Sequence, residues 1–333
     1  MFRKGFTVTC CLLVLALMVF SGCQRREAGD GTINLQVGMT LTMDSHYGMG
    51  LQEFQRLVAL YTDNTVNIEI FPNSLLGNER DLIESVSMGM VAMALTSTGP
   101  YPNFWPDFAI LDLPFLFPTA EIAYTILDGP IGQSLLNQLP ASGIIGLGFW
   151  ENGFRHVTNS VREIRTPEDL RGLRIRTMEN EIHMNTYQHY GASPTPMAMG
   201  EVFIALQQGV VDGQENPSIN IYTSRLHEVQ GFMSLTGNFY SPAPLIINRG
   251  IFERMTPQQQ EGIRRAATEA KHWQRQFSRD NDAWAIERIR ESGTIVTEVD
   301  LDVWIEASQP TFQDFAHLNQ DLINQIRAAA AAL

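Results

Sequence analysis

The sequence predicts an α/β fold built as two lobes. Strand-like and helix-like patterns alternate from Ile33 onward at the spacing of β–α–β units, which is typical of parallel sheets covered by helices on both faces. The same alternation begins again near residue 153. A helical pattern that begins at Thr256 is longer than one lobe of this chain would hold. With 333 residues the chain is long enough for two lobes.

The first lobe begins with three strands separated by two helices. Apolar residues recur at helical spacing between the strands, for example at Leu51, Phe54, Leu57 and Tyr61. The expected elements are a strand at 33–40, a helix that ends near 61, a strand at 66–71, a helix that begins near 77 and a strand at 91–97. Residues 99–118 are crowded with prolines and aromatic rings, which predicts a loop region packed against the core.

The second lobe repeats this pattern. An apolar run at 144–150 predicts a buried strand that leads into it, and TPEDL at 166–170 predicts a turn. The elements expected next are a strand at 173–177, helices at 180–191 and 200–209, and a short strand at 210–214. Because the pattern restarts, we expect no single sheet to run through both lobes.

The longest predicted element is a helix of about 37 residues after Thr256, or roughly 55 Å at ~1.5 Å per residue. Thr256 and Gln259 form the pattern of a capping box, with Pro257 at the first helical position. A helix of this length would run across both lobes and return the chain from one to the other. The predicted lobes are therefore discontinuous: 32–152 with 241–280, and 153–240 with 281–333.

The N-terminus has the pattern of an export signal. Arg3 and Lys4 precede an apolar run too short to span a membrane, and small residues follow it. This predicts a signal peptide at 1–22 and a polar linker at 23–31. Cys23, directly after Ser-Gly, resembles the lipidated cysteine of bacterial lipoproteins, with plain secretion as the alternative. Either reading predicts a periplasmic protein, with membrane contact only through such an anchor.

Charge and missing motifs exclude several classes of function. The formal net charge is −13 at pH 7, and an acidic surface repels nucleic acid and anionic membranes. The sequence carries no nucleophile elbow, metal-ligand spacing, Walker loop or dinucleotide fingerprint. We therefore expect no nucleic-acid partner, no metal, no cofactor and no enzymatic activity. On such a surface, any anion site must be built locally from particular arginines.

Two arginines of GLRIRTMEN, at 172–180, are candidates for that site. Leu173, Ile175 and Thr177 alternate with Arg174 and Arg176, the pattern of a half-buried strand with both guanidinium groups on one face. Water is the ordinary partner for such a face. The alternative is an anion, because the guanidinium fork matches a carboxylate through two hydrogen bonds.

Longer motifs carry a family resemblance over about residues 33–320. GFRHVTNSVREIRTPEDLRGLRIRT, ASPTPMA and DGQENP resemble the solute-binding proteins of TRAP transporters, the DctP-type family. The resemblance implies a two-lobed periplasmic-binding-protein-like fold with hinge strands and a long lobe-spanning helix. It also implies an organic-acid ligand and integral-membrane TRAP permease subunits as partners. Carried over by motif, Arg176 binds the ligand carboxylate, assisted by Arg155 and Asn216, while Arg174 lies at the rim. The alternative for Arg155 is a structural ion pair.

The remaining contacts are expected on the opposite wall. The resemblance implies that Glu79 faces the ligand hydroxyls. Ser97 ends the third predicted strand, at the edge where α/β sheets usually bind ligands, and His46, after the first strand, would donate to a hydroxyl or a second carboxylate. Glu179 is close to Arg176 in sequence, and Met199 would form an apolar wall or simply pack in the core. Carboxylates accept hydrogen bonds from hydroxyls, so two acidic residues favour a sugar acid such as a uronate or aldonate. The alternative is a four-carbon dicarboxylate.

Two alternative functions are an exported enzyme and a receptor that serves a different kind of partner. An exported enzyme would use Glu79 and His46 as acid and base, but the sequence offers it no nucleophile. A receptor for a sensor kinase or an ATP-driven importer would have the same binding site and a different partner.

Overall fold

The computed structural model describes residues 32–332, and contacts divide the chain into two units, Met1–Ile33 and Asn34–Leu333. The predicted signal peptide, the linker and Cys23 lie outside the described residues. Apart from the first residue of strand β1, the elements described below belong to the second unit.

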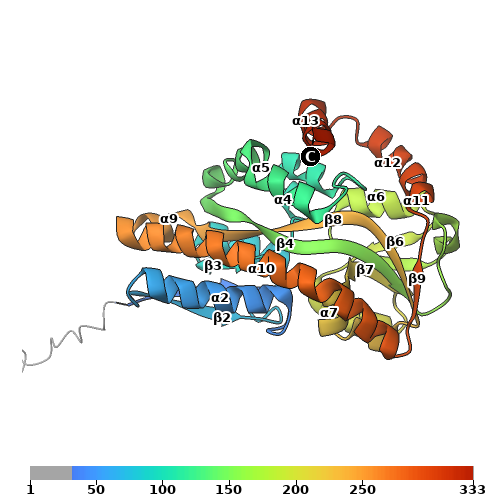
Figure 1. The fold of residues 1–333 in the computed structure, drawn as a ribbon, viewed down its shortest axis with the longest axis horizontal. Helices are drawn as coiled ribbons and strands as arrows, with labels where there is room; N and C mark the ends of the chain where they lie inside the picture. The colour runs from blue at the N-terminus through green and yellow to red at the C-terminus, as the bar shows by residue number, and fades with distance from the viewer. Residues whose placement is uncertain (1–31, 333) are drawn as a thin grey trace, which may run out of the picture. The chain divides into compact units, whose positions relative to one another are not determined.

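The strands described between residues 32 and 332 form one hydrogen-bonded sheet of nine (Figure 1). Their order is β2–β1–β3–β8–β4–β7–β5–β6, with β9 beside β8. The strands are β1 (Ile33–Gly38), β2 (Val66–Phe71), β3 (Met93–Leu95), β4 (Ile144–Asn159), β5 (Arg174–Thr177), β6 (Ser193–Pro196), β7 (Gly213–Pro217), β8 (Phe232–Asn248) and β9 (Ile295–Glu298).

Two long antiparallel strands, β4 and β8, join two parallel parts of this sheet. β1 and β3 are parallel on one side, and β5, β6 and β7 are parallel on the other. β8 pairs with β3, and β4 pairs with β7. The expectation that no single sheet runs through both lobes is therefore wrong, because β4 and β8 continue past the predicted boundary and pair on both sides of it. The lobe boundaries themselves remain a prediction.

The pairing of β4 with β8 is irregular where that boundary falls. Its register shifts between Gly146 and Phe149, between Glu151 and Gly153, and between Arg155 and Val157. Gly153 has φ of +121°, a conformation that side chains disfavour. Bulges of this kind bend a strand and interrupt its ladder of hydrogen bonds. The ladder between β4 and β8 is thus interrupted on both sides of the predicted boundary, and one of the interruptions begins at Arg155.

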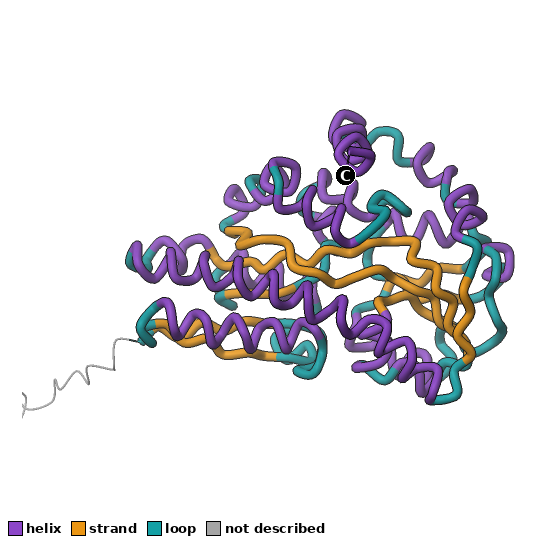
Figure 2. Tube along the Cα trace, viewed as in Figure 1, coloured by secondary structure: helices purple, strands orange, loops and turns teal. Residues whose placement is uncertain are grey.

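Helices cover both faces of the sheet (Figure 2). The α-helices are α2 (His46–Tyr61), α3 (Glu79–Met88), α4 (Ala120–Asp128), α5 (Pro130–Leu136), α6 (Glu181–His189), α7 (Met199–Gln207), α8 (Ser218–Thr223), α9 (Arg249–Glu253), α10 (Pro257–Glu291), α11 (Leu301–Ala307), α12 (Gln309–Asp314) and α13 (Gln320–Ala332). The 3-10 helices are η1 (Tyr101–Asn103), η2 (Pro106–Asp112), η3 (Leu139–Ser142), η4 (Pro167–Leu170) and η5 (Leu226–Val229).

The long helix predicted after Thr256 is α10, with 35 residues. Its capping box is formed: Gln259 N donates to Thr256 Oγ1 at 3.2 Å, and Thr256 N donates to Gln259 Oε1 at 3.0 Å. At ~1.5 Å per residue the helix is about 50 Å long. It packs against α2, β4, α8 and β9, and so spans both parts of the sheet (Figure 1).

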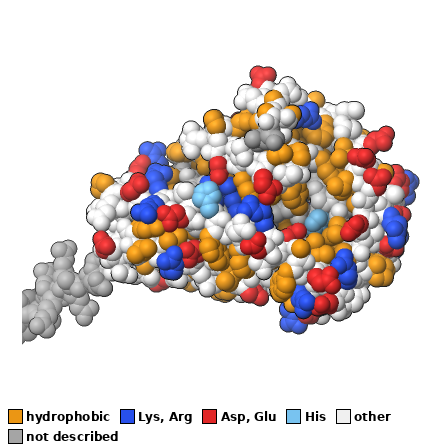
Figure 3. Space-filling view, in the orientation of Figure 1, with side chains coloured by type: hydrophobic (Ala, Val, Ile, Leu, Met, Phe, Trp, Pro, Cys, Tyr) orange, Lys and Arg blue, Asp and Glu red, His pale blue; other side chains and the backbone are white. Residues whose placement is uncertain are grey.

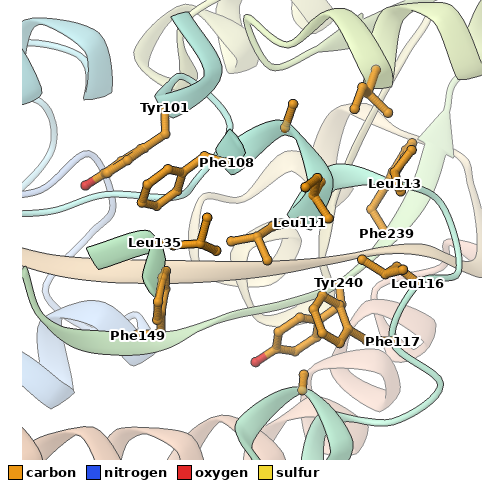
Figure 4. Packing of buried hydrophobic residues seen from close by; sticks show 14 of the residues in the cluster. Tyr101, Phe108, Leu111, Leu113, Leu116, Phe117, Leu135, Phe149, Phe239 and Tyr240 are labelled. Atoms are coloured by element: carbon orange, nitrogen blue, oxygen red, sulfur yellow. The ribbon is translucent and has the colours of Figure 1, made fainter. Parts of the chain in front are cut away.

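The largest apolar cluster is packed against the long strands, and Figure 4 shows part of it. Residues 99–118 contribute heavily, as predicted for a packed loop region. The ring of Phe108 lies 5.0 Å from that of Tyr101 and 6.3 Å from that of Phe149 on β4. A smaller cluster packs α7 and α8 against the end of α10. These cores hold the strand ends that carry the site.

Basic and acidic side chains are interspersed on the face that Figure 3 shows. This distribution gives an anion no broad basic surface on that face. No helix within residues 32–332 is both long enough and apolar enough to cross a membrane.

Candidate functional site

A cavity with an empty volume of about 280 Å³, its open mouth included, lies where the two parts of the sheet meet. Six predicted site residues line it: Arg176, Arg155, Asn216, Glu79, Ser97 and Met199. They come from β5, β4, β7, α3, the end of β3 and α7. The ends of parallel strands are the usual ligand position in α/β sheets. The structure thus brings together side chains that lie far apart in the sequence.

Arg176 is a buried cation that has no acidic partner in the described part of the chain. Its side chain is on β5, and the residue is 3% exposed. Nε and Nη2 donate to the carbonyl oxygen of Met197 at 2.9 and 2.6 Å. Among residues 32–332 no carboxylate oxygen lies within 4 Å of this guanidinium. Burial lowers the pKa of Arg176 to about 10, so the group stays charged at neutral pH. A buried charge of this kind is costly unless an anion pairs with it.

Arg155 is buried as well, but it has an ion-pair partner in Glu215. Nη2 of Arg155 lies 3.0 Å from Glu215 Oε1, and Nε donates to Oε2. Nη2 also donates to Asn216 Oδ1 at 3.2 Å. Burial alone would raise the pKa of Glu215, but Arg155 and His183 outweigh it and bring that pKa to about 2. The structural ion pair given above as the alternative for Arg155 is thus present, and Arg155 lines the cavity too.

His183 lies behind this pair, away from the cavity. Its ring stacks on Phe239 with centroids 3.9 Å apart. Nδ1 is 3.6 Å from Glu215 Oε1, and Nε2 is 3.4 Å from Asp112 Oδ1. Burial lowers the pKa of His183, whereas the two carboxylates raise it, and the net direction is upward. His183 therefore supports the orientation of Glu215 and does not reach the ligand space.

Glu79 and Ser97 form the opposite wall of the cavity. Asn78 caps α3 and makes Glu79 its first residue, which directs the carboxylate towards the end of β3. The backbone N–H of Ser97 donates to Glu79 Oε1 at 2.6 Å, and Ser97 Oγ donates to Oε2 at 2.6 Å. Both oxygens are therefore held in place. Each keeps lone-pair capacity for a hydroxyl.

Two predicted residues, His46 and Glu179, do not line this cavity. His46 is buried at the start of α2, and the next residue, Tyr47, lines the cavity in its place. Neighbouring helical residues point about 100° apart, so only one of the two can face it. Glu179 lies further out, where it lines an adjoining hollow that shares Arg176 and Glu79 with this cavity, and its Oε2 is 3.9 Å from Arg80 Nη1.

Arg174 also lies outside the cavity, as the rim prediction expects. Its side chain is 48% exposed, and Nη2 is 2.6 Å from Asp212 Oδ1. The alternation in GLRIRT therefore places an exposed arginine and a buried arginine on one short strand. The alternation alone gives both arginines the same face, and it was the family resemblance that assigned the rim to Arg174.

Sequence reasoning missed several lining residues, among them Tyr47, Asn152 and Asn220. Asn220 Nδ2 donates to Asn152 Oδ1 at 2.9 Å, and Asn152 Nδ2 donates to Ser241 Oγ at 3.3 Å. The sequence did hold a signal for Asn220: it lies four positions after the predicted Asn216, in α8, which begins directly after the strand β7 that carries Asn216. Within residues 32–332 no group of three metal-ligating side chains is placed to hold an ion.

A family model described as bacterial extracellular solute-binding protein, family 7 (DctP), matches residues 37–318. A TRAP periplasmic solute-binding protein from Polaromonas sp. JS666, solved with D-erythronate, has 43% identity and a TM-score of 0.87, over 89% of this chain and 98% of that one. The sugar acid binding protein DctPAm from Advenella mimigardefordensis, solved with galactonate, has 32% identity and a TM-score of 0.87, over 90% and 98%.

A third protein has a different type of ligand. The C4-dicarboxylate-binding periplasmic protein DctP of Rhodobacter capsulatus is 30% identical to this chain over 294 residues, which are 86% of this chain and 88% of the relative. The matched proteins thus include binders of sugar acids and of dicarboxylates.

Proposed function

This chain belongs to the bacterial extracellular solute-binding proteins of family 7, the periplasmic receptors of TRAP transporters, and from that premise we propose that it binds a sugar acid through Arg176. Proteins of this family bind small organic acids and work with TRAP permeases, and they are receptors of transporters and not enzymes. The fold is the two-lobed α/β fold of these receptors.

The observation that carries the proposal is the unpaired charge of Arg176. Glu215 balances Arg155, whereas Arg176 has only the carbonyl oxygen of Met197 among the described residues. A ligand carboxylate would supply the missing negative charge and accept two parallel N–H bonds. Removing water from both ions costs free energy, and the ion pair offsets this cost only when it is well hydrogen-bonded. Arg155 and Asn216 lie beside this position and would complete the carboxylate end.

The opposite wall supports a polyhydroxylated acid. Glu79 is fixed by Ser97 and can accept hydrogen bonds only from donors, which a sugar acid provides through its hydroxyls. A second carboxylate at this end would meet the negative charge of Glu79. The sequence identity to the proteins solved with D-erythronate and galactonate also supports a polyhydroxylated acid. A four-carbon dicarboxylate is the second candidate, supported by the match to the Rhodobacter protein.

A ligand screen tests the proposal. Purified protein would be heated with galactonate, D-erythronate, galacturonate, succinate or malate, because a ligand that binds only the native state raises the melting temperature. We expect the largest shifts for the monocarboxylates that carry several hydroxyls. Larger shifts for succinate and malate would favour the dicarboxylate candidate. Prolonged incubation followed by NMR checks that the ligand is returned unchanged.

Closure of two lobes over the ligand is part of the proposal. We propose the boundaries given above, 32–152 with 241–280 and 153–240 with 281–333, and place the bend in β4 and β8. The register shifts beside Arg155 support a bend there. Closure would remove water from the carboxylate and strengthen its pairing with Arg176.

Attachment to a membrane through Cys23 is a separate proposal that rests on the sequence of the first 23 residues alone. The matched receptors give it no support. Expression of the full chain followed by detergent phase partition would test it: a lipidated chain enters the detergent phase, and a Cys23→Ser chain stays in the aqueous phase. Equal partition of the two chains would contradict the anchor.

A further inference from the structure

Two polar groups in the cavity have no role in the contacts described so far. The hydroxyl of Tyr47 and the Oδ1 atom of Asn220 are buried, and neither has a hydrogen-bond partner among residues 32–332. Both residues line the cavity with Arg176 and Arg155. An unpartnered buried polar atom is unfavourable, so such atoms facing a binding cavity indicate where a ligand must supply partners.

The Oδ1 atom of Asn220 has a restricted chemistry. Its amide Nδ2 donates to Asn152 Oδ1 at 2.9 Å, which leaves Oδ1 as an acceptor. A carboxylate, a ketone or an ether cannot donate a hydrogen bond to it. A hydroxyl can. The ligand therefore needs an O–H group within reach of Asn220.

The neighbours of Asn220 place this acceptor at the carboxylate end of the cavity. Its partner Asn152 lies three positions before Arg155 on β4. Asn216, on β7 two residues before α8 begins, accepts from Arg155 Nη2 at 3.2 Å. The hydrogen bond to Asn152 thus ties Asn220 to β4, the strand that carries Arg155, whereas Glu79 and Ser97 form the other wall. The hydroxyl it requires lies close to the ligand carboxylate.

Tyr47 supplies a donor in the same cavity. It stands in the first turn of α2 and is 1% exposed. Burial and the nearby negative charge of Glu79 raise the pKa of Tyr47, and Arg155 opposes them only in part. The phenol therefore keeps its proton and can donate to a ligand oxygen. A hydroxyl both accepts from a phenol and donates to an amide oxygen, and it is the group with this property that a sugar acid carries.

We propose that Asn220 and Tyr47 recognise a hydroxyl on the carbon next to the ligand carboxylate, so that this receptor selects 2-hydroxy acids. The inference rests on the proposed function, because it takes the carboxylate to lie on Arg176. It adds a requirement that the charged residues do not impose. An acid with hydroxyls only at its far end would satisfy Glu79 and leave Asn220 unpaired.

A pair of ligands tests this without any mutation. D-Erythronate and 3,4-dihydroxybutanoate differ only in the hydroxyl next to the carboxylate, and calorimetry would give both dissociation constants. We expect D-erythronate to bind about 10- to 100-fold more tightly, because the deoxy acid leaves a buried acceptor without a donor. Equal affinities would overturn the inference and leave the proposed function standing. Binding of neither acid, with tight binding of succinate, would overturn both.

Amino-acid substitutions test which residues cause the preference for D-erythronate. In Asn220→Leu and in Tyr47→Phe the preference for D-erythronate should shrink, to within about threefold for Asn220→Leu, where the acceptor is gone. Tyr190→Phe is the matched control, since Tyr190 is buried, bonds to Ser308 at 2.5 Å and lies outside the residues that line the cavity. It should keep the wild-type preference. An unchanged preference in both Asn220→Leu and Tyr47→Phe would show that other residues read this hydroxyl.

Discussion

Arg155 is paired with Glu215 across β4 and β7, while Arg176, on the neighbouring strand β5, has no acidic partner among the described residues. The two arginines therefore have different surroundings although both line one cavity. The first is held as part of a neutral pair that fixes the wall. For the second, we propose that a ligand carboxylate balances the charge.

The first prediction separates Arg176 from Arg174. Arg176→Ala should weaken binding by roughly 30-fold to several thousand-fold, since losing one side of a buried charge pair costs about 2–5 kcal/mol. Arg176→Lys should fail nearly as badly, because an ammonium cannot reproduce the two-pronged contact. Arg174→Ala is the control and should change affinity by less than about threefold. Calorimetry would measure the affinity of each variant for the acid that gives the largest thermal shift in the screen. Loss of binding in Arg174→Ala with retention in Arg176→Ala would reverse the assignment.

The second prediction concerns the stability of the unliganded protein. Glu215→Gln removes the charge opposite Arg155, both being fully buried, and should lower the free energy of unfolding by about 3–5 kcal/mol. The control is Glu253→Gln, which breaks the exposed pair with Arg249 and should cost no more than about 1 kcal/mol. Urea unfolding followed by circular dichroism measures both. Similar losses for the two variants would mean that the buried pair is not a special source of stability.

The third prediction is a pH dependence caused by His46. Burial lowers its pKa from 6.5 to about 3, so between these values the unfolded state binds a proton that the folded state does not. Stability should therefore fall as pH falls below 6.5, and this residue should account for about 2 kcal/mol between pH 7 and pH 5. His46→Gln should show a correspondingly flatter slope. His317→Gln, an exposed position, should keep the wild-type slope. Parallel slopes for all three proteins would exclude His46 as the cause.

The fourth prediction concerns closure. Small-angle scattering should show a smaller radius of gyration when a verified ligand is added, because the lobes move together. Arg176→Ala at the same ligand concentration should keep the radius of the unliganded protein. An unchanged radius for the wild type with saturating ligand would argue against closure.

Much of this fold follows from local sequence patterns. The capping box at Thr256 predicted the start of α10, and the pairing of Glu79 with Ser97 agrees with their expected place on one wall. The joined sheet did not follow, since the pairing of β4 with β8 depends on contacts between distant segments and on irregular register. No local pattern states which strands will be neighbours.

A site residue could be predicted where a sequence motif specified its position. It could not be predicted where the direction of a side chain determines whether the residue faces the cavity. Arg176 came from a motif, and its burial agrees with the assigned position. His46 was predicted and Tyr47 was not, but Tyr47 is the one of the two that lines the cavity. Glu215 lay unremarked inside GQENP, and its role depends on Arg155, which is remote in the sequence.

The position of β8 in the middle of the sheet has a consequence for how the protein reaches the periplasm. β8 pairs Leu245, from the last third of the chain, with Leu95, from the first third, and also pairs with β4. Pairings between distant segments form slowly, and this one cannot begin until the ribosome has made most of the chain. A protein that is threaded through a membrane must stay unfolded until it has crossed. A central strand that is made late delays formation of the native sheet, which agrees with passage of an unfolded chain across a membrane.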